Sequence, residues 1–228
     1  MGQLENADVG VAGDSARREA ERVRQMSEDA RAARSRLASV FLGPSAEYRR
    51  LATRESRWAT GARGEELLAD SLRHRCPGVL LLHDRRMPGS RANIDHIAVA
   101  QSGVYVIDAK CYRGKIEVHE PLFGQPKLLI AGRDRTKLVA GLVKQVAAVR
   151  GALADVEPEV PVDGCFCFVA PEGRLADVGL PLLRTLRVNG FPLYYSRRLA
   201  KRLNSGGALG SERAAQIHAQ LARSLKRA

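Results

Sequence analysis

Two apolar segments with three residues between them constrain the fold of this chain most tightly. Residues 93–100 and 104–110 are rich in Val, Ile and Ala, and Gln101-Ser102-Gly103 separates them. A connection this short joins neighbouring antiparallel strands, because parallel strands need a crossover of a dozen residues or more. The sequence therefore predicts a β-hairpin that carries charged residues within two otherwise apolar strands.

The register of this hairpin decides which charged side chains meet. If Ser102-Gly103 forms a two-residue turn, Asp95 pairs with Lys110 and Asp108 is its diagonal neighbour, so that all three side chains share one face. A three-residue loop without a bulge would instead place Asp95 on the opposite face, because side chains alternate along a strand. Any joint function of the three residues therefore depends on the turn.

Two carboxylates and one ammonium group on a sheet face need an explanation, because buried charges without partners are costly. One interpretation is an exposed salt bridge between Asp95 and Lys110, worth less than about 1 kcal/mol. It leaves Asp108 unexplained after the apolar run 104–107. A Mg²⁺ ion, which takes carboxylate and carbonyl oxygens and water, explains the pair better. Lys110 beside it would orient and polarise an attacking water.

The rest of the chain alternates between strand-like and helix-like segments. This order predicts an α/β fold with a mixed sheet. Gly61 and Gly64 are expected to interrupt a helical pattern. Further strands are expected at 79–83, 115–119, 127–131 and 164–170, and at 185–195 with an interruption at Gly190. One helix is expected through the fifties and a second one from the glycines to about residue 75. Later helices are expected at about 136–153, 196–204 and 211–227.

The N-terminal part is expected to form a helical arm. Residues 1–13 are small and polar, which favours disorder, and a heptad-like stripe follows from Ala16 to Val40 before Gly43-Pro44 ends the pattern. The stripe is mostly Ala, so packing of the arm on its own domain is favoured over a weak homodimer through this helix. We expect residues 1–57 to form the arm and residues 58–228 the core.

The charge of the chain favours a nucleic-acid partner. The chain of 228 residues has 37 Lys and Arg against 25 Asp and Glu, a net charge of +12. Residues 1–60 hold eleven Arg and nine acidic residues, so most of the excess lies in the core. A basic field attracts polyanions, although a solvated basic surface without such a partner remains the alternative. Without an apolar run of membrane length or a secretory signal, a cytoplasmic protein is expected.

Several other residues with chemical potential have structural explanations. Buried structural Cys is favoured over a zinc site, His96 should pack on the face opposite Asp95, and His83 and His119 are isolated in the sequence. The basic residues after Tyr194-Tyr195 could contact phosphates and stack on bases, or form a solvated helix face. The zinc site would use Cys165, Cys167, His74 and Cys76, and the basic residues are Arg197, Arg198, Lys201 and Arg202.

Glu65 is a further acidic candidate. On a helix it shares its face with Leu68, Ala69 and Leu72, whereas Glu66 points elsewhere and is expected at the surface. A carboxylate on the core-facing stripe needs a cation or hydrogen-bond donors. An acidic residue in a first helical turn, favoured by the helix dipole, is an equally good explanation.

Three segments together resemble the nuclease-related domain called NERD, which is similar to the PD-(D/E)xK superfamily of restriction and Holliday-junction nucleases. The resemblance covers about residues 58–155, and its specificity comes from the order and spacing of the segments. It implies a restriction-endonuclease-like mixed sheet flanked by helices. The segments are Gly61-Ala62-Arg63-Gly64-Glu65, Asn93-Ile94-Asp95-His96-Ile97 and Gly103-Val104-Tyr105-Val106-Ile107-Asp108-Ala109-Lys110.

The resemblance assigns roles to particular residues. Glu65 matches the helix glutamate, Asp95 the first-strand metal aspartate, and Asp108 with Lys110 the acid-x-Lys motif. Asp108 stands where a glutamate is common, and its shorter side chain would alter the metal geometry. Gln145 resembles a glutamine on the following helix, where a surface residue is the equal alternative. Gly114 also fits the family's glycine after the lysine.

These observations lead to an expected function with two alternatives. The expectation is a Mg²⁺- or Mn²⁺-dependent nuclease that hydrolyses phosphodiester bonds in DNA, with Asp95, Asp108 and Glu65 at the metal and Lys110 and Gln145 completing the catalytic set. The first alternative is a non-catalytic module that binds nucleic acid. The second is an interaction scaffold with a vestigial site.

Overall fold

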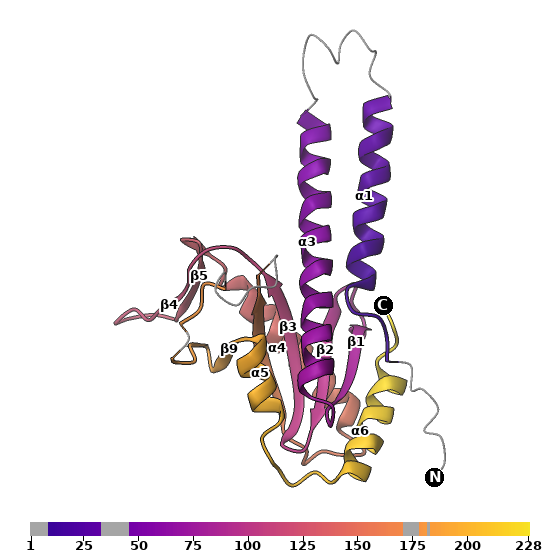
Figure 1. The fold of residues 1–228 in the computed structure, drawn as a ribbon, viewed down its shortest axis with the longest axis vertical. Helices are drawn as coiled ribbons and strands as arrows, with labels where there is room; N and C mark the ends of the chain where they lie inside the picture. Colours follow the sequence, from indigo (N-terminus) through magenta and orange to yellow (C-terminus); the bar gives the residue numbers. More distant parts are fainter. Residues whose placement is uncertain (1–8, 33–45, 171–177, 182) are drawn as a thin grey trace.

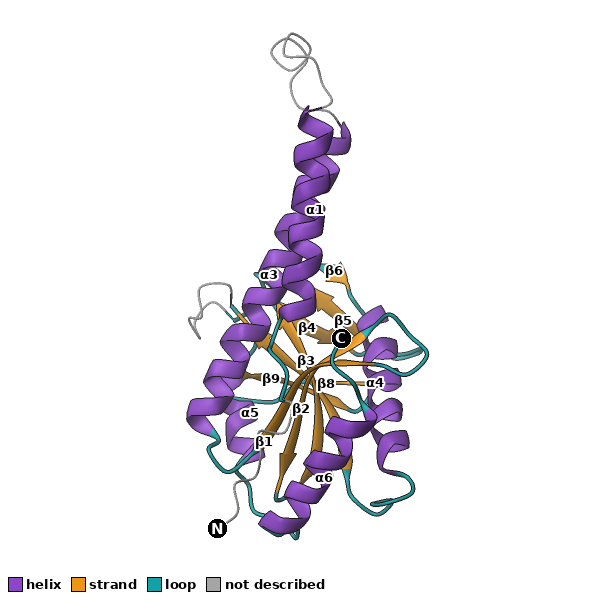
Figure 2. Ribbon diagram, turned by 90° about the vertical axis from the view of Figure 1, so that its right-hand side faces the viewer, coloured by secondary structure: helices purple, strands orange, loops and turns teal. Residues whose placement is uncertain are grey.

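A six-stranded mixed sheet with helices on both faces forms the body of the protein (Figures 1 and 2). The computed structural model describes residues 9–32, 46–170, 178–181 and 183–228. The strand order is β1-β2-β3-β7-β9-β8, and a second sheet of three short strands has the order β4-β5-β6. The chain is therefore an α/β protein with a mixed sheet, flanking helices and a helical N-terminal region, as predicted.

The elements follow one another along the chain with these bounds. The helices are α1 (Asp14–Ala32), α3 (Ala46–Arg75), α4 (Lys137–Leu153), α5 (Ser196–Leu203) and α6 (Ser211–Ser224). The strands of the large sheet are β1 (Leu80–Arg86), β2 (Asn93–Ala100), β3 (Gly103–Cys111), β7 (Val162–Val169), β8 (Arg187–Val188) and β9 (Phe191–Tyr195). The small sheet consists of β4 (Ile116–His119), β5 (Lys127–Ile130) and β6 (Arg133–Asp134).

Each face of the large sheet has its own apolar core. Helices α4 and α6 cover one face, where Leu142 and Ile217 pack with Val106. Helices α3 and α5 cover the other, where Leu68 and Leu199 pack with Ile107. The central strand β7 is parallel to β3 and to β9 and is buried nearly throughout, which explains its almost unbroken apolar sequence.

The β2–β3 hairpin has a register two residues away from the predicted one. Ala100 pairs with Gly103 and His96 with Ile107, so the loop is Gln101-Ser102. Gly103 begins β3 with φ +130°, and a Cβ there would lie 2.7 Å from the Pro161 carbonyl oxygen. The predicted pairing of Asp95 with Lys110 is therefore wrong. A shift of two residues preserves the face of every side chain, however.

Helix α3 is a single helix of 30 residues, so the predicted interruption at Gly61 and Gly64 is wrong. Gly64 instead lets the helix lie close to β3, because a Cβ there would lie 2.6 Å from the Cβ of Cys111. The predicted boundary between residues 57 and 58 falls inside α3. Whether 58–228 folds independently of the arm stays a prediction.

Helix α1 packs along the N-terminal half of α3, and the two helices project from the sheet as a hairpin (Figure 1). The N-terminal stretch was expected to be disordered through residue 13, but the carbonyl oxygen of Val9 accepts a hydrogen bond from the amide of His83 at 2.8 Å. Residues 9–13 thus lie against β1. Residues 1–8 and the expected helix end at Gly43-Pro44 lie outside the described residues.

Two further details complete the fold. The predicted strand 185–195 is a hairpin whose two-residue turn, Asn189-Gly190, has positive φ at both positions. The short strand β6 was not predicted. Across the described ranges, none of the helices has the length and apolarity that crossing a membrane requires.

Candidate active site

The candidate site lies where the β2–β3 hairpin opens. Main-chain pairing between the two strands runs from Ala100–Gly103 to His96–Ile107. Beyond it, a side chain replaces the main chain: Asp95 Oδ2 accepts a hydrogen bond from the Ala109 amide at 2.8 Å. The Asp95 carboxylate is thereby fixed against β3, between the positions of Asp108 and Lys110.

Lys110 joins the two aspartates of the hairpin. Its Nζ donates to Asp108 Oδ1 at 2.5 Å and to the carbonyl oxygen of Ala109 at 3.0 Å, and lies 3.8 Å from Asp95 Oδ2. The side chain of Asp108 is 7% exposed, and those of Asp95 and Lys110 are each 18% exposed. The predicted proximity of the three residues is confirmed, and little water screens their charges.

Burial dominates the electrostatics of this group. Burial, and to a lesser extent the charge of Asp95, raises the pKa of Asp108, whereas the Lys110 ammonium group lowers it, and the resulting pKa is about 7. Burial alone would lower the pKa of Lys110, but the carboxylates of Asp108 and Asp95 outweigh it and hold the pKa above its ordinary value. Burial therefore contributes more to the raised pKa of Asp108 than the neighbouring carboxylate of Asp95 does.

Glu65 approaches the same group from α3. Its pKa is raised to about 9, first by burial and then by the charges of Asp95 and Asp84, while a hydrogen bond from the Gly13 amide lowers it. Glu65 is therefore protonated at neutral pH. The adjacent Glu66 instead forms salt bridges with Arg17 and Arg63 near the surface, as its helical position predicts.

Asp84 is a fourth acidic residue of the site, and the sequence analysis missed it. Its side chain is buried and accepts hydrogen bonds from the amide and hydroxyl of Ser15, at 2.6 and 2.7 Å. Asp84 has φ +49°, an unusual value for a non-glycine residue within a strand. A charged residue directly after the predicted strand 79–83 was the available signal, but its partner lies 69 residues away.

Gln145 is buried on α4 and belongs to the same region of the fold. Its Nε2 donates to the carbonyl oxygen of Asn93 at 3.3 Å, two residues before Asp95. Its Oε1 is buried without a hydrogen-bond partner. A buried acceptor without a partner is costly, which suits a side chain held for a ligand. Gln145 is therefore not the surface residue that was the alternative, and its role in catalysis stays a prediction.

The histidines and cysteines of the core have structural positions. His96 is fully buried, as expected, but His83 is not isolated, because the Nδ1 atoms of the two rings lie 2.8 Å apart. Burial lowers both pKa values to about 3, so both rings are neutral. Burial also raises the pKa of the Cys165 and Cys167 thiols, which makes them poor nucleophiles and metal ligands.

The atoms around the Lys110 ammonium group are oxygens, the type of ligand that a hard divalent cation prefers. Two carboxylates and one carbonyl oxygen surround its ammonium group, and Mg²⁺ is typically held by one or two carboxylates together with water or substrate phosphates. Within the described ranges, no three His, Cys, Asp or Glu side chains are grouped so as to hold a metal ion. The donors thus fit a site with two protein carboxylates.

Comparison with known proteins gives one match. The family model described as nuclease-related domain, NERD, matches residues 60–169. The match runs from α3 to the end of β7 and includes Glu65, Asp95, Asp108, Lys110 and Gln145, but not the N-terminal residues that contact Asp84. No curated protein and no solved structure matches the chain.

Proposed function

We propose that this chain, whose residues 60–169 match the family model of the nuclease-related domain, NERD, is a divalent-metal-dependent nuclease acting on DNA. The position of the Lys110 ammonium group between the carboxylates of Asp108 and Asp95 carries the proposal. A purely structural ion pair would need one carboxylate, and a surface that only binds phosphate would be weakened by two. The pair therefore favours chemistry on a phosphodiester.

In this proposal Asp95 and Asp108 hold a Mg²⁺ or Mn²⁺ ion, and Glu65 is the third acidic residue near it. When bound, such an ion polarises a phosphoryl oxygen and lowers the pKa of a bound water. The raised pKa of Asp108, about 7, is consistent with a group whose ionised form a cation would stabilise.

The chain's own residues supply the remaining functions. Lys110 keeps its proton because its pKa is raised, so its ammonium group stabilises the negative charge that develops on the phosphate oxygens. Glu65, protonated at neutral pH, holds a proton that it can deliver to the leaving oxygen. Gln145 has a free buried Oε1 that can accept a hydrogen bond from the attacking water.

The charge of the protein and its cysteines support the partner and the compartment in this proposal. A net charge of +12 favours a polyanionic substrate. Cys76, Cys165 and Cys167 are free thiols, which suits the reducing cytoplasm.

Cleavage of defined nucleic acids tests the proposal. Single-stranded, duplex, nicked and branched DNA, and RNA, are incubated with the full chain in Mg²⁺, Mn²⁺ or chelator. We expect metal-dependent cleavage of DNA that Asp108→Asn and Lys110→Met abolish and that Asp70→Asn, a change at an exposed helix position, leaves intact. Binding of DNA without cleavage in either metal would support the non-catalytic module instead.

A further inference from the structure

A large pocket lies at the opposite side of β7 from the candidate active site, because β9 is too short to cover β7. Strand β9 pairs with β7 only along Phe166–Phe168, which leaves residues 162–165 of β7 without a neighbouring strand on that edge. Helix α4 borders the resulting space on one side and α5 on the other. The pocket has a volume of about 930 Å³, within the range of about 300–1,000 Å³ typical of ligand sites.

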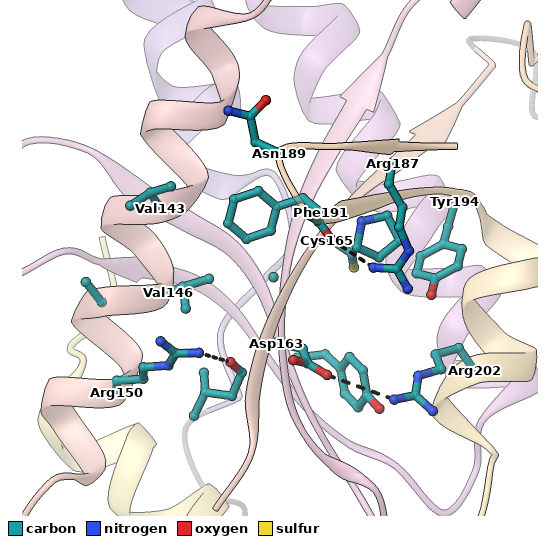
Figure 3. Close-up of a pocket in the computed structure, with 16 residues that line it drawn as sticks. Val143, Val146, Arg150, Asp163, Cys165, Arg187, Asn189, Phe191, Tyr194 and Arg202 are labelled. Atoms are coloured by element: carbon teal, nitrogen blue, oxygen red, sulfur yellow. Dashed lines mark hydrogen bonds and ion pairs between the residues drawn. The ribbon is translucent and has the colours of Figure 1, made fainter. Parts of the chain in front are cut away.

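Three arginines from three separate elements border this pocket (Figure 3). Arg150 comes from α4, Arg187 from β8 and Arg202 from α5, and all three are exposed. Asp163 is the one acidic residue among the described lining residues, and it lies 3.9 Å from Arg202. The lining is therefore net positive, which favours an anionic ligand.

Aromatic rings lie between these arginines. Figure 3 shows Phe191 between the α4 side of the pocket and the α5 side, where Tyr194 and Arg202 lie. The Phe191 ring packs directly on β7, because a Cβ at Gly164 would lie 2.8 Å from its Cε1. The guanidinium group of Arg202 lies 5.5 Å from the centre of the Tyr105 ring. Rings beside guanidinium groups match a base beside a phosphate.

An extended peptide would be the other occupant of an open strand edge. The protein's own side chains already occupy this edge. The guanidinium group of Arg150 donates a hydrogen bond to the Val162 carbonyl oxygen at 2.9 Å, and Phe191 covers Gly164. The main-chain groups that a peptide would use are thus partly satisfied or covered. The pocket presents side chains rather than a strand edge.

We propose that this pocket binds a nucleotide unit of single-stranded nucleic acid, with the base against Phe191 and Tyr194 and the phosphate on Arg187 and Arg202. The inference shares with the proposed function the premise that the ligand is nucleic acid. It rests on other residues, however, and does not require the acidic cluster to be catalytic.

Binding measurements on uncleavable complexes test this inference. The host is the full chain with Asp108→Asn, so that loss of cleavage and loss of pocket binding are measured separately. The ligands are an oligothymidylate of about eight nucleotides, thymidine monophosphate and inorganic phosphate. The affinity of each ligand is measured by calorimetry. Binding of the oligonucleotide and the nucleotide, each tighter than phosphate, supports a base-stacking site, and the ratio of the two affinities distinguishes a strand from a free nucleotide.

Single substitutions in this host locate the binding. Phe191→Leu keeps an apolar side chain over Gly164 and should weaken oligonucleotide binding by at least about fivefold. Arg187→Gln should weaken it and lower the slope of log affinity against log salt by about one. Arg223→Gln, an exposed charge change on α6 outside the pocket, is the matched control and should have little effect.

Two results would overturn the inference. Equal loss of affinity in Arg187→Gln and Arg223→Gln, with no loss in Phe191→Leu, would mean that the general basic field binds the strand. Tighter binding by an extended acidic peptide than by the oligonucleotide would mean that the pocket is a peptide site. The melting temperature of each variant shows that the fold is intact.

Discussion

Lys110 Nζ donates to Asp108 Oδ1 at 2.5 Å, so each of these two buried side chains has the other as its ionic partner. Asp108 is almost completely buried at the end of an apolar strand, and burial raises its pKa. The ammonium group of Lys110 opposes that increase, and the resulting pKa is about 7. The two residues of the acid-x-Lys pair therefore support the local fold as well as the proposed chemistry.

Replacing Lys110 should destabilise the protein in a pH-dependent way. In Lys110→Met, Asp108 loses its cation, and breaking a buried ion pair typically costs about 3–5 kcal/mol while the remaining partner is charged. Because Lys110 lowers the pKa of Asp108, that pKa lies above about 7 in the variant, so protonation of Asp108 should remove the uncompensated charge and restore stability as the pH falls from alkaline towards neutral. Urea unfolding at mildly alkaline, neutral and mildly acidic pH measures this. Lys127→Met on β5, an exposed position, is the control, and a loss independent of pH would contradict the explanation.

Glu65 should make the wild-type protein less stable at alkaline pH. Its pKa is about 9 in the folded protein and 4.5 ordinarily, so the folded state retains a proton that the unfolded chain has released. The stabilisation that this retained proton provides is complete below about pH 4.5 and is lost as the pH rises towards 9. Above about pH 7 Asp108 has largely titrated, which leaves Glu65 as the main contributor of the two.

The matching measurement compares wild type with Glu65→Gln, which cannot ionise. Unfolding free energies from about pH 7 to 9 should fall in the wild type and stay flatter in the variant. Parallel curves for the two proteins would show that Glu65 is already ionised at neutral pH, and its proposed role as a proton donor would then fail.

The hairpin and its charged side chains could be predicted because their determinants are local. A three-residue gap imposes antiparallel strands, and alternation places Asp95, Asp108 and Lys110 on one face of the sheet for every even shift of register. The true register depends on Gly103, whose lack of a side chain allows contact with Pro161. That contact is 58 residues away in the chain, so a local pattern does not contain it.

The contribution of the N-terminal segment could not be predicted for the same reason. Val9, Gly13 and Ser15 have no strong pattern, yet they bond to His83, Glu65 and Asp84. Gly64 likewise reads as a helix breaker in the sequence, whereas in the fold it provides space for Cys111. In both cases the observed structure depends on tertiary contacts that a local sequence pattern does not contain.

Ser15 should couple the arm to the site. In Ser15→Ala the Asp84 carboxylate loses the hydroxyl donor but keeps the Ser15 amide, so the expected loss of stability is about 1 kcal/mol. Thermal unfolding measures the loss, and Ser71→Ala, at a half-buried position on α3, is the control. Deleting residues 1–43 removes both donors and should cost more, while the remainder still melts cooperatively. An unchanged melting temperature in both variants would mean that the arm does not support the site.

Divalent metal should raise the melting temperature most in Lys110→Met, less in the wild type and least in Asp108→Asn. The ammonium group lies among the oxygens of Asp95, Asp108 and Ala109, where it competes with a cation for the same donors. Mg²⁺ or Mn²⁺ at about 100 times its dissociation constant adds about 2.7 kcal/mol to the free energy of unfolding.

Removing the competing ammonium group in Lys110→Met leaves two carboxylates close together, so the metal-induced rise in melting temperature should be larger there than in the wild type. Asp108→Asn has the same shape but one carboxylate fewer, so its rise should be the smallest of the three. Melting curves with Mg²⁺, Mn²⁺ or chelator give the order directly. Equal rises in wild type and Asp108→Asn would mean that the ion binds elsewhere, and the assignment of Asp95 and Asp108 as metal ligands would be wrong.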